Sequence, residues 1–324
     1  MGTRGQEQLK PMEREFFVNE LDIDVEDKDI ERLFNPYITE KFSPDDPAWL
    51  KLVEENAKQQ RCRRLRRQLL GWISKFRRTQ RGIQKAYSLM WADVSVEEQL
   101  EKESGSASYV WRGQGMRART IGYKRIHLLY FVHLLKRLRP ATVLEVGCGN
   151  GLNLLVLSSC FPEIRFVGVE FTAGGVRAFQ TTRSRDALPP AIERFSPVPI
   201  CDSHAFQRVS VVQGNAAMLP FSDRSFDLVV TSLALEQMEE VRTMALSEIA
   251  RVADSHVAML EPFHEWNESG TRQDYILAND YFAGRIADLP LLGLEPVYAT
   301  ADMPSKLTFQ PGIVVCRRDQ SCKS

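Results

Sequence analysis

The stretch Val143-Leu144-Glu145-Val146-Gly147-Cys148-Gly149-Asn150-Gly151 is the most informative part of this chain. Four residues that suit a β-strand lead into a turn with glycines at alternate positions. Because glycine lacks a Cβ atom, the backbone can turn sharply there and a ligand can approach the main chain closely. An acid stands two residues before the first glycine. We interpret the stretch as a strand that ends in a nucleoside-binding loop.

The spacing of these glycines differs from both common phosphate-binding loops. A dinucleotide loop reads G-x-G-x-x-G, and a P-loop needs G-x-x-x-x-G-K followed by Ser or Thr. Here the loop reads G-C-G-N-G, and the residues after it lack the P-loop Lys and hydroxyl. The pattern E-x-G-x-G-x-G after a strand resembles motif I of the class I S-adenosylmethionine-dependent methyltransferases. That resemblance implies an S-adenosyl-L-methionine site whose cofactor-binding residues include Glu145, Gly147, Gly149 and Gly151.

A second acid extends the resemblance, which runs from about Lys124 to Arg317. Glu170 ends the apolar run that begins at Phe166, one βαβ unit beyond the glycine loop. A carboxylate at that place can accept both ribose hydroxyls through its two oxygens. By resemblance to the family, Glu170 is the ribose-binding acid.

Two later segments match the family pattern with one substitution each. The run from Gln213 to Phe221 resembles the family's G-D-A followed by L-P-F, but Asn215 replaces the Asp. An amide oxygen can still accept from the adenine amine, without the charge, so we expect a weaker contact. The backbone N–H of Ala216 is expected to meet an adenine ring nitrogen. Ser225 to Glu236 resembles the fourth strand and its loop, which makes Leu233 part of the pocket floor beside the sulfonium.

Fewer sequence features support the assignment of catalytic residues. Where the family often continues L-E-H, this chain has Gln237 in place of the His. The candidate general bases that remain are Glu236 and His264, together with Glu265, although a surface loop position explains His264 more simply. Neither N-P-P-Y/F nor Pro-Cys follows the fourth strand, which argues against amide, adenine and cytosine-C5 methylation.

Alternating apolar runs and helical stripes predict the fold. Strands are expected at 142–146, 166–170, 209–212, 227–232, 257–261 and 313–316, and helices at 126–138, 152–160, 174–183, 239–252 and 273–287. This alternation implies a parallel sheet covered on both faces. The expected fold class is α/β, a Rossmann-like seven-stranded mostly parallel sheet flanked by helices, with a helical N-terminal extension. We divide the chain into residues 1–115, the extension, and 116–324, the methyltransferase domain.

Composition narrows the functional class. The chain has 324 residues, 44% hydrophobic and 26% charged, with zero formal net charge, so bulk charge favours neither nucleic acid nor membrane. The six cysteines form no C-x-x-C pair, which fits reduced thiols better than disulfides or a metal site. No apolar run reaches the roughly 18 residues that span a bilayer. We expect a cytoplasmic protein without a metal cofactor.

Acidic and basic residues are concentrated in two separate segments of the N-terminal extension. Residues 13–55 hold 14 acids and 5 bases, whereas 58–85 hold 11 bases and no acid. Leu65, Leu69, Trp72, Ile73 and Phe76 predict an apolar helix stripe in the basic block. Either this helix packs on the domain with its bases paired to the acidic segment, or it binds RNA, anionic lipid or an acidic substrate.

These observations predict an S-adenosylmethionine-dependent methyltransferase that acts on a small molecule, lipid or sugar. Two alternatives stay open: an RNA methyltransferase that uses the basic helix, and a non-catalytic cofactor-binding partner subunit. A protein partner that binds the extension is also possible. The acceptor must be recognised by the N-terminal 115 residues, the proline-containing segment 184–206 and the region after Glu261.

Overall fold

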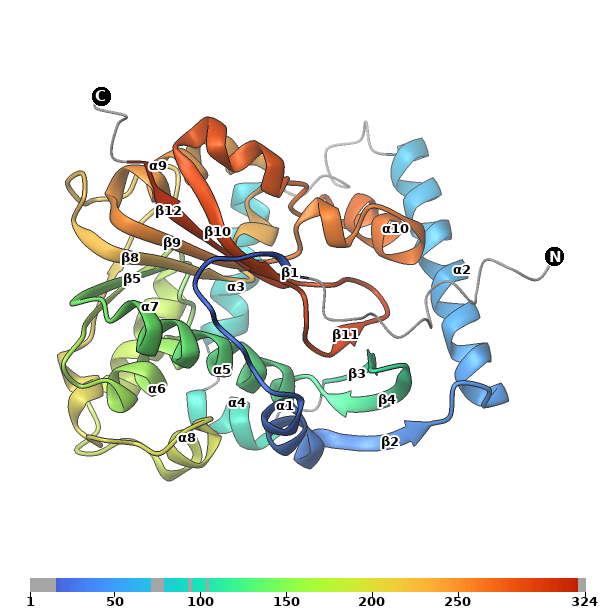
Figure 1. Ribbon diagram of the computed structural model, residues 1–324, viewed down its shortest axis with the longest axis horizontal. Helices are drawn as coiled ribbons and strands as arrows, with labels where there is room; N and C mark the ends of the chain where they lie inside the picture. Colours follow the sequence, from blue (N-terminus) through green and yellow to red (C-terminus); the bar gives the residue numbers. More distant parts are fainter. Residues whose placement is uncertain (1–15, 71–78, 93–94, 103–104, 320–324) are drawn as a thin grey trace.

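An eight-stranded sheet forms the centre of the molecule (Figure 1). The computed structural model describes residues 16–70, 79–92, 95–102 and 105–319. The strands of the sheet are ordered β1-β10-β12-β9-β8-β5-β6-β7. Their bounds are β1 (Phe16–Asn19), β5 (Thr142–Val146), β6 (Arg165–Glu170), β7 (Ser210–Gln213), β8 (Phe226–Ser232), β9 (Ala253–Glu261), β10 (Leu294–Thr300) and β12 (Gly312–Arg318).

The pairing within this sheet is mostly parallel, as the alternating sequence predicts. β7, β6, β5, β8 and β9 run parallel to one another. β12, β10 and β1 extend the sheet with antiparallel pairs. The carboxyl ends of the parallel strands therefore meet along one edge, where open α/β sheets place their ligands.

Helices cover both faces of this sheet, which is why the strand sequences are almost continuously apolar. The helices that connect or flank the strands are α5 (Ile121–Leu138), α6 (Leu152–Cys160), α7 (Ala173–Arg183), α8 (Pro190–Phe195), α9 (Arg242–Val252) and α10 (Gly270–Asn279). In β8, Leu228 and Val230 enter the apolar core that contains α5, α6 and α7, whereas Val229 enters the core that contains α9. The α/β fold is confirmed.

The number of strands is one more than the expected seven. β1 comes from the N-terminal extension and pairs antiparallel with β10, with Val18 opposite Ala299. Its four residues lie in a strongly acidic segment, so no alternation of apolar and polar residues marks them. A long-range pairing, which local pattern does not encode, creates this edge strand.

The extension is not helical throughout. It contains α1 (Asp27–Phe34), α2 (Pro47–Leu70), α3 (Gln80–Ala92) and α4 (Val96–Lys102), but also β2 (Ile38–Phe42), β3 (Ser106–Trp111) and β4 (Gln114–Arg119). These strands form a second sheet in the order β11-β3-β4-β2, in which β11 (Ser305–Lys306) comes from the far end of the chain. The division into two domains stays a prediction, and its boundary after residue 115 lies inside β4.

Helix α2, which carries much of the basic block, packs beside α10, as Figure 1 shows at its right-hand side. Arg64 pairs with Asp274 at 2.8 Å, and Arg67 pairs with Asp280. The partners are thus acids of the C-terminal half rather than of the acidic segment. The predicted apolar stripe is wrong for Leu65 and Leu69, whose exposed fractions are 52% and 73%. These leucines face outward because the ion pairs of Arg64 and Arg67 turn the other face of the helix toward α10.

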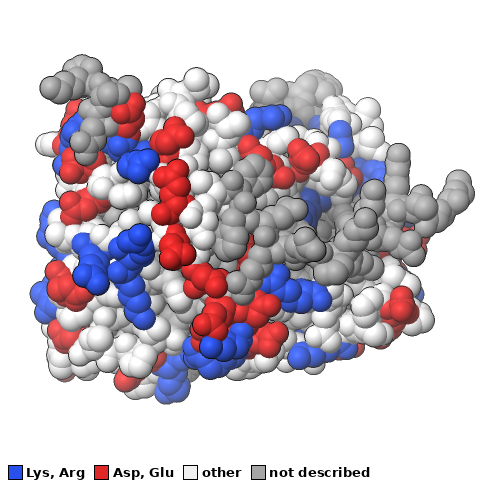
Figure 2. Space-filling view, viewed as in Figure 1, with Lys and Arg blue, Asp and Glu red and all other residues white. Residues whose placement is uncertain are grey.

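The rest of the predicted stripe, Trp72, Ile73 and Phe76, lies outside the described residues. Acidic and basic side chains are interspersed on the face in Figure 2, consistent with the zero net charge. None of the helices in the described ranges has the length and apolar character that a bilayer crossing requires.

Candidate functional site

A cavity of about 430 Å³ lies at the carboxyl ends of β5, β6 and β8. That volume is within the range of small-molecule sites, roughly 300–1,000 Å³. Its lining includes eight residues predicted from sequence: Glu145, Gly147, Gly149, Glu170, Asn215, Ala216, Leu233 and Glu236. Four strands or their following loops thus bring these positions together, although they span more than ninety positions in the chain.

The glycine loop has the backbone that its sequence predicts. Gly147 has φ of +76°, and a Cβ atom there would lie 2.5 Å from the Cβ of Ala234 in the cavity floor. Gly151 has φ of +78°, and its Cβ would lie 2.4 Å from the ring of Phe179. Gly151 does not line the cavity. It starts α6 and allows α7 to pack closely, so its role here is to shape the loop.

Glu145 is buried, with one oxygen bound and one without a partner among the described residues. Its Oε1 accepts from the Asn153 amide at 2.7 Å, while Oε2 is buried and unpaired. Burial raises the pKa of Glu145 to about 7, against the opposing effects of the Asn153 hydrogen bond and the positive charge of Lys124. A cationic group in the cavity would find an acceptor at this oxygen.

Glu170 ties the glycine loop to the start of α7. Its Oε2 accepts from the backbone N–H of Gly149 at 3.0 Å. Its Oε1 accepts from both the N–H and the hydroxyl of Thr172, at 2.8 and 2.6 Å. A carboxylate offers about four acceptor positions, so the remaining capacity for a ribose hydroxyl lies on Oε2.

Asn215 and Ala216 line the same cavity beyond Glu170. The Asn215 side-chain oxygen accepts from the N–H of Ala217 at 2.9 Å, which fixes the turn after β7. One lone pair of that oxygen is therefore engaged within the turn. Ala216 is 4% exposed and packs with the core around α9.

The floor of the cavity is held by a buried acid that we did not single out from the sequence as a site residue. Leu233 has φ of +51°, a conformation that a branched side chain rarely adopts. The Glu261 carboxylate, fully buried at the end of β9, accepts from the N–H groups of Ala234, Leu235 and Glu236 at 3.0–3.2 Å. Burial, with the nearby charge of Glu236, raises the pKa of Glu261 to about 8.

The two predicted general bases are placed differently. Glu236 lines the cavity, and its Oε1 accepts from Gln237 at 2.6 Å. His264 does not line it. Its ring Nε2 lies 3.5 Å from the Arg285 guanidinium, and its backbone N–H donates to Gly284. The structure brings Glu236, but not His264, to the lining of the cavity.

Several lining residues were missed because they come from outside the motifs. Gln80, Ile83 and Tyr87 of α3 cover the cavity, and Gln99 of α4 contacts the glycine loop. The sequence pointed to these residues only in that they belong to the N-terminal extension, which we expected to recognise the acceptor. Other missed side chains include Lys124, His127 and Lys306. The aromatic side chain of Tyr123 also lines the cavity, whereas Tyr109 and Trp111 are buried and do not line it.

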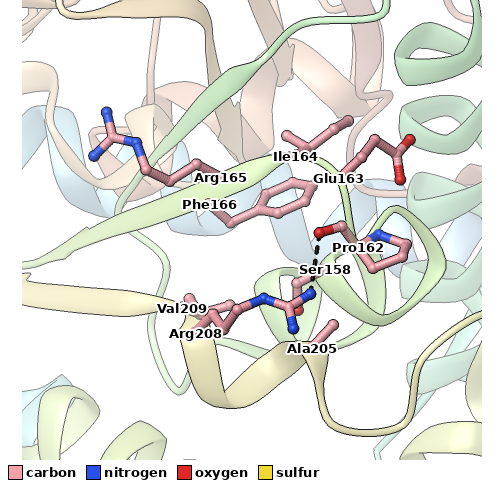
Figure 3. A pocket seen from close by; sticks show the side chains of 9 residues that line it. All are labelled: Ser158, Pro162, Glu163, Ile164, Arg165, Phe166, Ala205, Arg208 and Val209. Carbon is pink, nitrogen blue, oxygen red and sulfur yellow. Dashed lines mark hydrogen bonds between the residues drawn. The ribbon is translucent and has the colours of Figure 1, made fainter.

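A second hollow of about 320 Å³ lies at the opposite edge, by the amino ends of β6 and β7 (Figure 3). Arg208 of the η4 turn (Ala205–Arg208) donates to the carbonyl of Pro162 at 3.0 Å, and the Arg165 side chain points away from it. Ligands of open parallel sheets bind at the other edge. The predicted residues gather there, so the larger cavity is the candidate site.

Comparison with known proteins agrees with this location. Residues 144–259, from β5 to β9, match the methyltransferase domain family. A demethylmenaquinone methyltransferase of Roseiflexus sp. (strain RS-1) is 32% identical over 120 residues, which cover 36% of this chain and 41% of that protein. A protein of the same name from Roseiflexus castenholzii is 33% identical over 110 residues, 34% of this chain and 37% of that one. The match therefore spans less than half of these relatives.

Solved structures match over a longer stretch at lower identity. The magnesium protoporphyrin IX methyltransferase of Synechocystis PCC 6803 with bound SAH has a TM-score of 0.44 and 15% identity, over 61% of this chain and 85% of that chain. The matched family segment carries the glycine loop, the second-strand acid and the cavity floor in the expected order. The chain thus contains a segment, residues 144–259, that is similar to the methyltransferase domain family.

Proposed function

We propose that this protein transfers a methyl group from S-adenosylmethionine to a small-molecule acceptor. The observation that carries the proposal is the convergence of seven predicted cofactor residues on one cavity at the ligand-binding edge of the sheet. Its enclosure by α3 and α4 favours a small acceptor over a large one. The two Roseiflexus relatives, which are named demethylmenaquinone methyltransferases, support the same class of acceptor.

The cofactor fits the polar groups around the cavity. The free Oε2 of Glu145 is suited to the ammonium of the methionine part, and Lys124 supplies a positive charge for its carboxylate. Glu170 Oε2 is suited to a ribose hydroxyl, and Asn215 with Ala216 to the adenine. Gly147 and Gly149 leave room for the ligand to lie against the main chain.

The cofactor supplies a methyl group on a positively charged sulfur, a strong electrophile. The protein then has to hold the acceptor in line with that methyl and exclude water. Leu233 and Ala234, held by Glu261, form the apolar floor beneath it. Glu236 is the cavity residue suited to remove a proton where the acceptor needs a general base. His264 lies outside the cavity and has no role in this proposal.

The function is tested by incubating the full-length protein with S-adenosylmethionine and a small-molecule extract. We expect S-adenosylhomocysteine to accumulate together with a product heavier by one CH₂ group, and neither to form with the Gly147→Arg variant. A parallel reaction with an RNA fraction distinguishes the RNA alternative, because label from the methyl group would then enter RNA. Tight cofactor binding without S-adenosylhomocysteine in any fraction would overturn methyl transfer and favour a non-catalytic partner subunit.

A further inference from the structure

One end of the cavity carries polar side chains that the cofactor assignment does not use. Tyr123 and His127 lie one turn apart on α5, with ring centroids 4.5 Å apart. Lys306 of β11 reaches the same end from the small sheet, and its ammonium lies 5.7 Å from the centre of the Tyr123 ring. All three side chains line the cavity.

Two of these side chains have polar atoms for which the described residues provide no partner. The Tyr123 hydroxyl and the Nε2 atom of His127 are buried and have no hydrogen-bond partner among the described residues. The two residues are 2% and 1% exposed. Leaving such a group unpaired costs about 1–3 kcal/mol, so two of them side by side need an explanation. A polar ligand group in the cavity provides one.

The electrostatic surroundings of this end are positive. Burial, together with the charges of Lys306 and Lys124, lowers the pKa of His127 to about 3, so its imidazole is neutral at neutral pH. Arg272, which donates to Ser305 beside Lys306, adds a positive charge near Tyr123. A neutral imidazole can carry its proton on Nε2 and donate from it. Hydroxyl, imidazole and ammonium are then three donors at one end of the cavity.

The two lysines of the cavity come from different elements, and Lys124 of the two also acts on Glu145. Lys124 acts on Glu145, and this pair matches the ammonium and carboxylate of the cofactor's methionine part. Lys306 acts on His127, and it is placed by the pairing of β11 with β3, opposite Tyr109. Because Lys124 can meet the carboxylate of the cofactor's methionine part, we assign Lys306, which lies beside Tyr123, to the acceptor.

We propose that Tyr123, His127 and Lys306 form the acceptor subsite and bind an acidic oxygen of the methyl acceptor, either a carboxylate or a phenolate. This inference rests on the proposed function. Charge-assisted hydrogen bonds to such an oxygen are about twice as strong as neutral ones, which gives the subsite its selectivity. An acidic oxygen also needs no general base before it attacks or activates a neighbouring carbon.

The test is calorimetric titration of the full-length protein, saturated with S-adenosylhomocysteine, at a pH at which the acidic probes are ionised. The probes are benzoate, para-nitrophenolate and the uncharged benzamide. We expect at least one anion to bind about tenfold or more tightly than benzamide, and the stronger of the two to identify the source of the oxygen. Equal binding of all three probes, or binding of none, would overturn the subsite.

Variants of Lys306 distinguish a role in acceptor binding from a role in cofactor binding. Lys306→Gln should remove the preference for the anion while S-adenosylhomocysteine affinity stays within about twofold, and Lys306→Arg should keep part of it. Lys41→Gln, the same change at an exposed position of the same small sheet, is the matched control. A loss of about tenfold in S-adenosylhomocysteine affinity in Lys306→Gln would instead assign the cluster to the cofactor's carboxylate. Failure of the wild type to bind S-adenosylhomocysteine would overturn the proposed function itself.

Discussion

The side-chain amide of Asn150, inside the glycine loop, donates a 2.8 Å hydrogen bond to the Oε1 atom of Gln99 in α4. The two residues are 51 positions apart in the chain. Asn150 is 3% exposed, so this bond is formed in the interior. The N-terminal extension thus helps to hold the loop that we assign to the cofactor, in addition to covering the cavity with α3.

Gln99→Ala should therefore weaken the cofactor site by removing a hydrogen bond that holds its glycine loop. The change leaves the Asn150 amide buried and unpaired, at a cost of about 1–3 kcal/mol. We expect a lower melting temperature and an affinity for S-adenosylhomocysteine reduced severalfold, measured by calorimetry. Gln68→Ala, at an exposed position of α2, is the control. Identical behaviour of the two variants would show that the contact does not support the loop.

The pH dependence of cofactor binding should report Glu145. Burial raises its pKa to about 7, so below that pH the free protein holds a proton that the cofactor's ammonium must displace. Affinity should fall as pH drops below about 7, by up to roughly tenfold per unit. Glu145→Gln should bind more weakly with a flatter profile. A wild-type affinity that is constant from acidic to alkaline pH would contradict this assignment.

Stability of the free protein should follow the opposite trend at this group. A native pKa above the ordinary value of 4.5 means that the stabilising contribution is complete below pH 4.5 and is lost as pH rises through about 7. Thermal melts of wild type and Glu145→Gln across this range check the sign. As pH rises through about 7, the wild type should lose stability relative to Glu145→Gln, which has no group that titrates at this position.

Gly151→Ala should destabilise the protein more than the same change at Gly293. Both glycines have similar backbone angles, with φ of +78° and +70°, so the conformational cost of about 1–2 kcal/mol is shared. A Cβ atom at Gly151 meets the Phe179 ring at 2.4 Å, whereas one at Gly293 meets nothing within 4 Å. Overpacking adds about 1–3 kcal/mol, measurable by chemical denaturation. Equal losses would contradict the close packing of α7 on the loop.

Local sequence was sufficient for the parts of the site that lie at strand ends. Glu145, Gly147 and Glu170 each follow directly from an apolar strand and a fixed loop spacing, and parallel pairing brings their strand ends to one edge. Glu236 was found in the same way, in the loop after β8. His264 was chosen by the same rule after β9, but the loop there turns toward Arg285 instead.

The remaining lining residues depend on long-range pairing, which no local pattern specifies. Lys306 belongs to a two-residue strand, and only its pairing with Tyr109 in β3 places it beside Tyr123. β1 became the eighth strand through a similar distant pairing with β10. The residues of α3 and α4 that cover the cavity come from a helical pattern that says nothing about what the helices contact.

The most direct measurement is calorimetry of S-adenosylmethionine binding to the wild type and to Gly147→Arg and Glu170→Ala. The arginine would enter the space against Ala234, and the alanine would remove the carboxylate that joins Gly149 to Thr172. We predict binding to the wild type and a loss of at least about tenfold in each variant, while Gly293→Arg and Glu193→Ala, at an unobstructed glycine and at an exposed residue of α8, bind normally. Unchanged affinity in both Gly147→Arg and Glu170→Ala would contradict the location of the cofactor site.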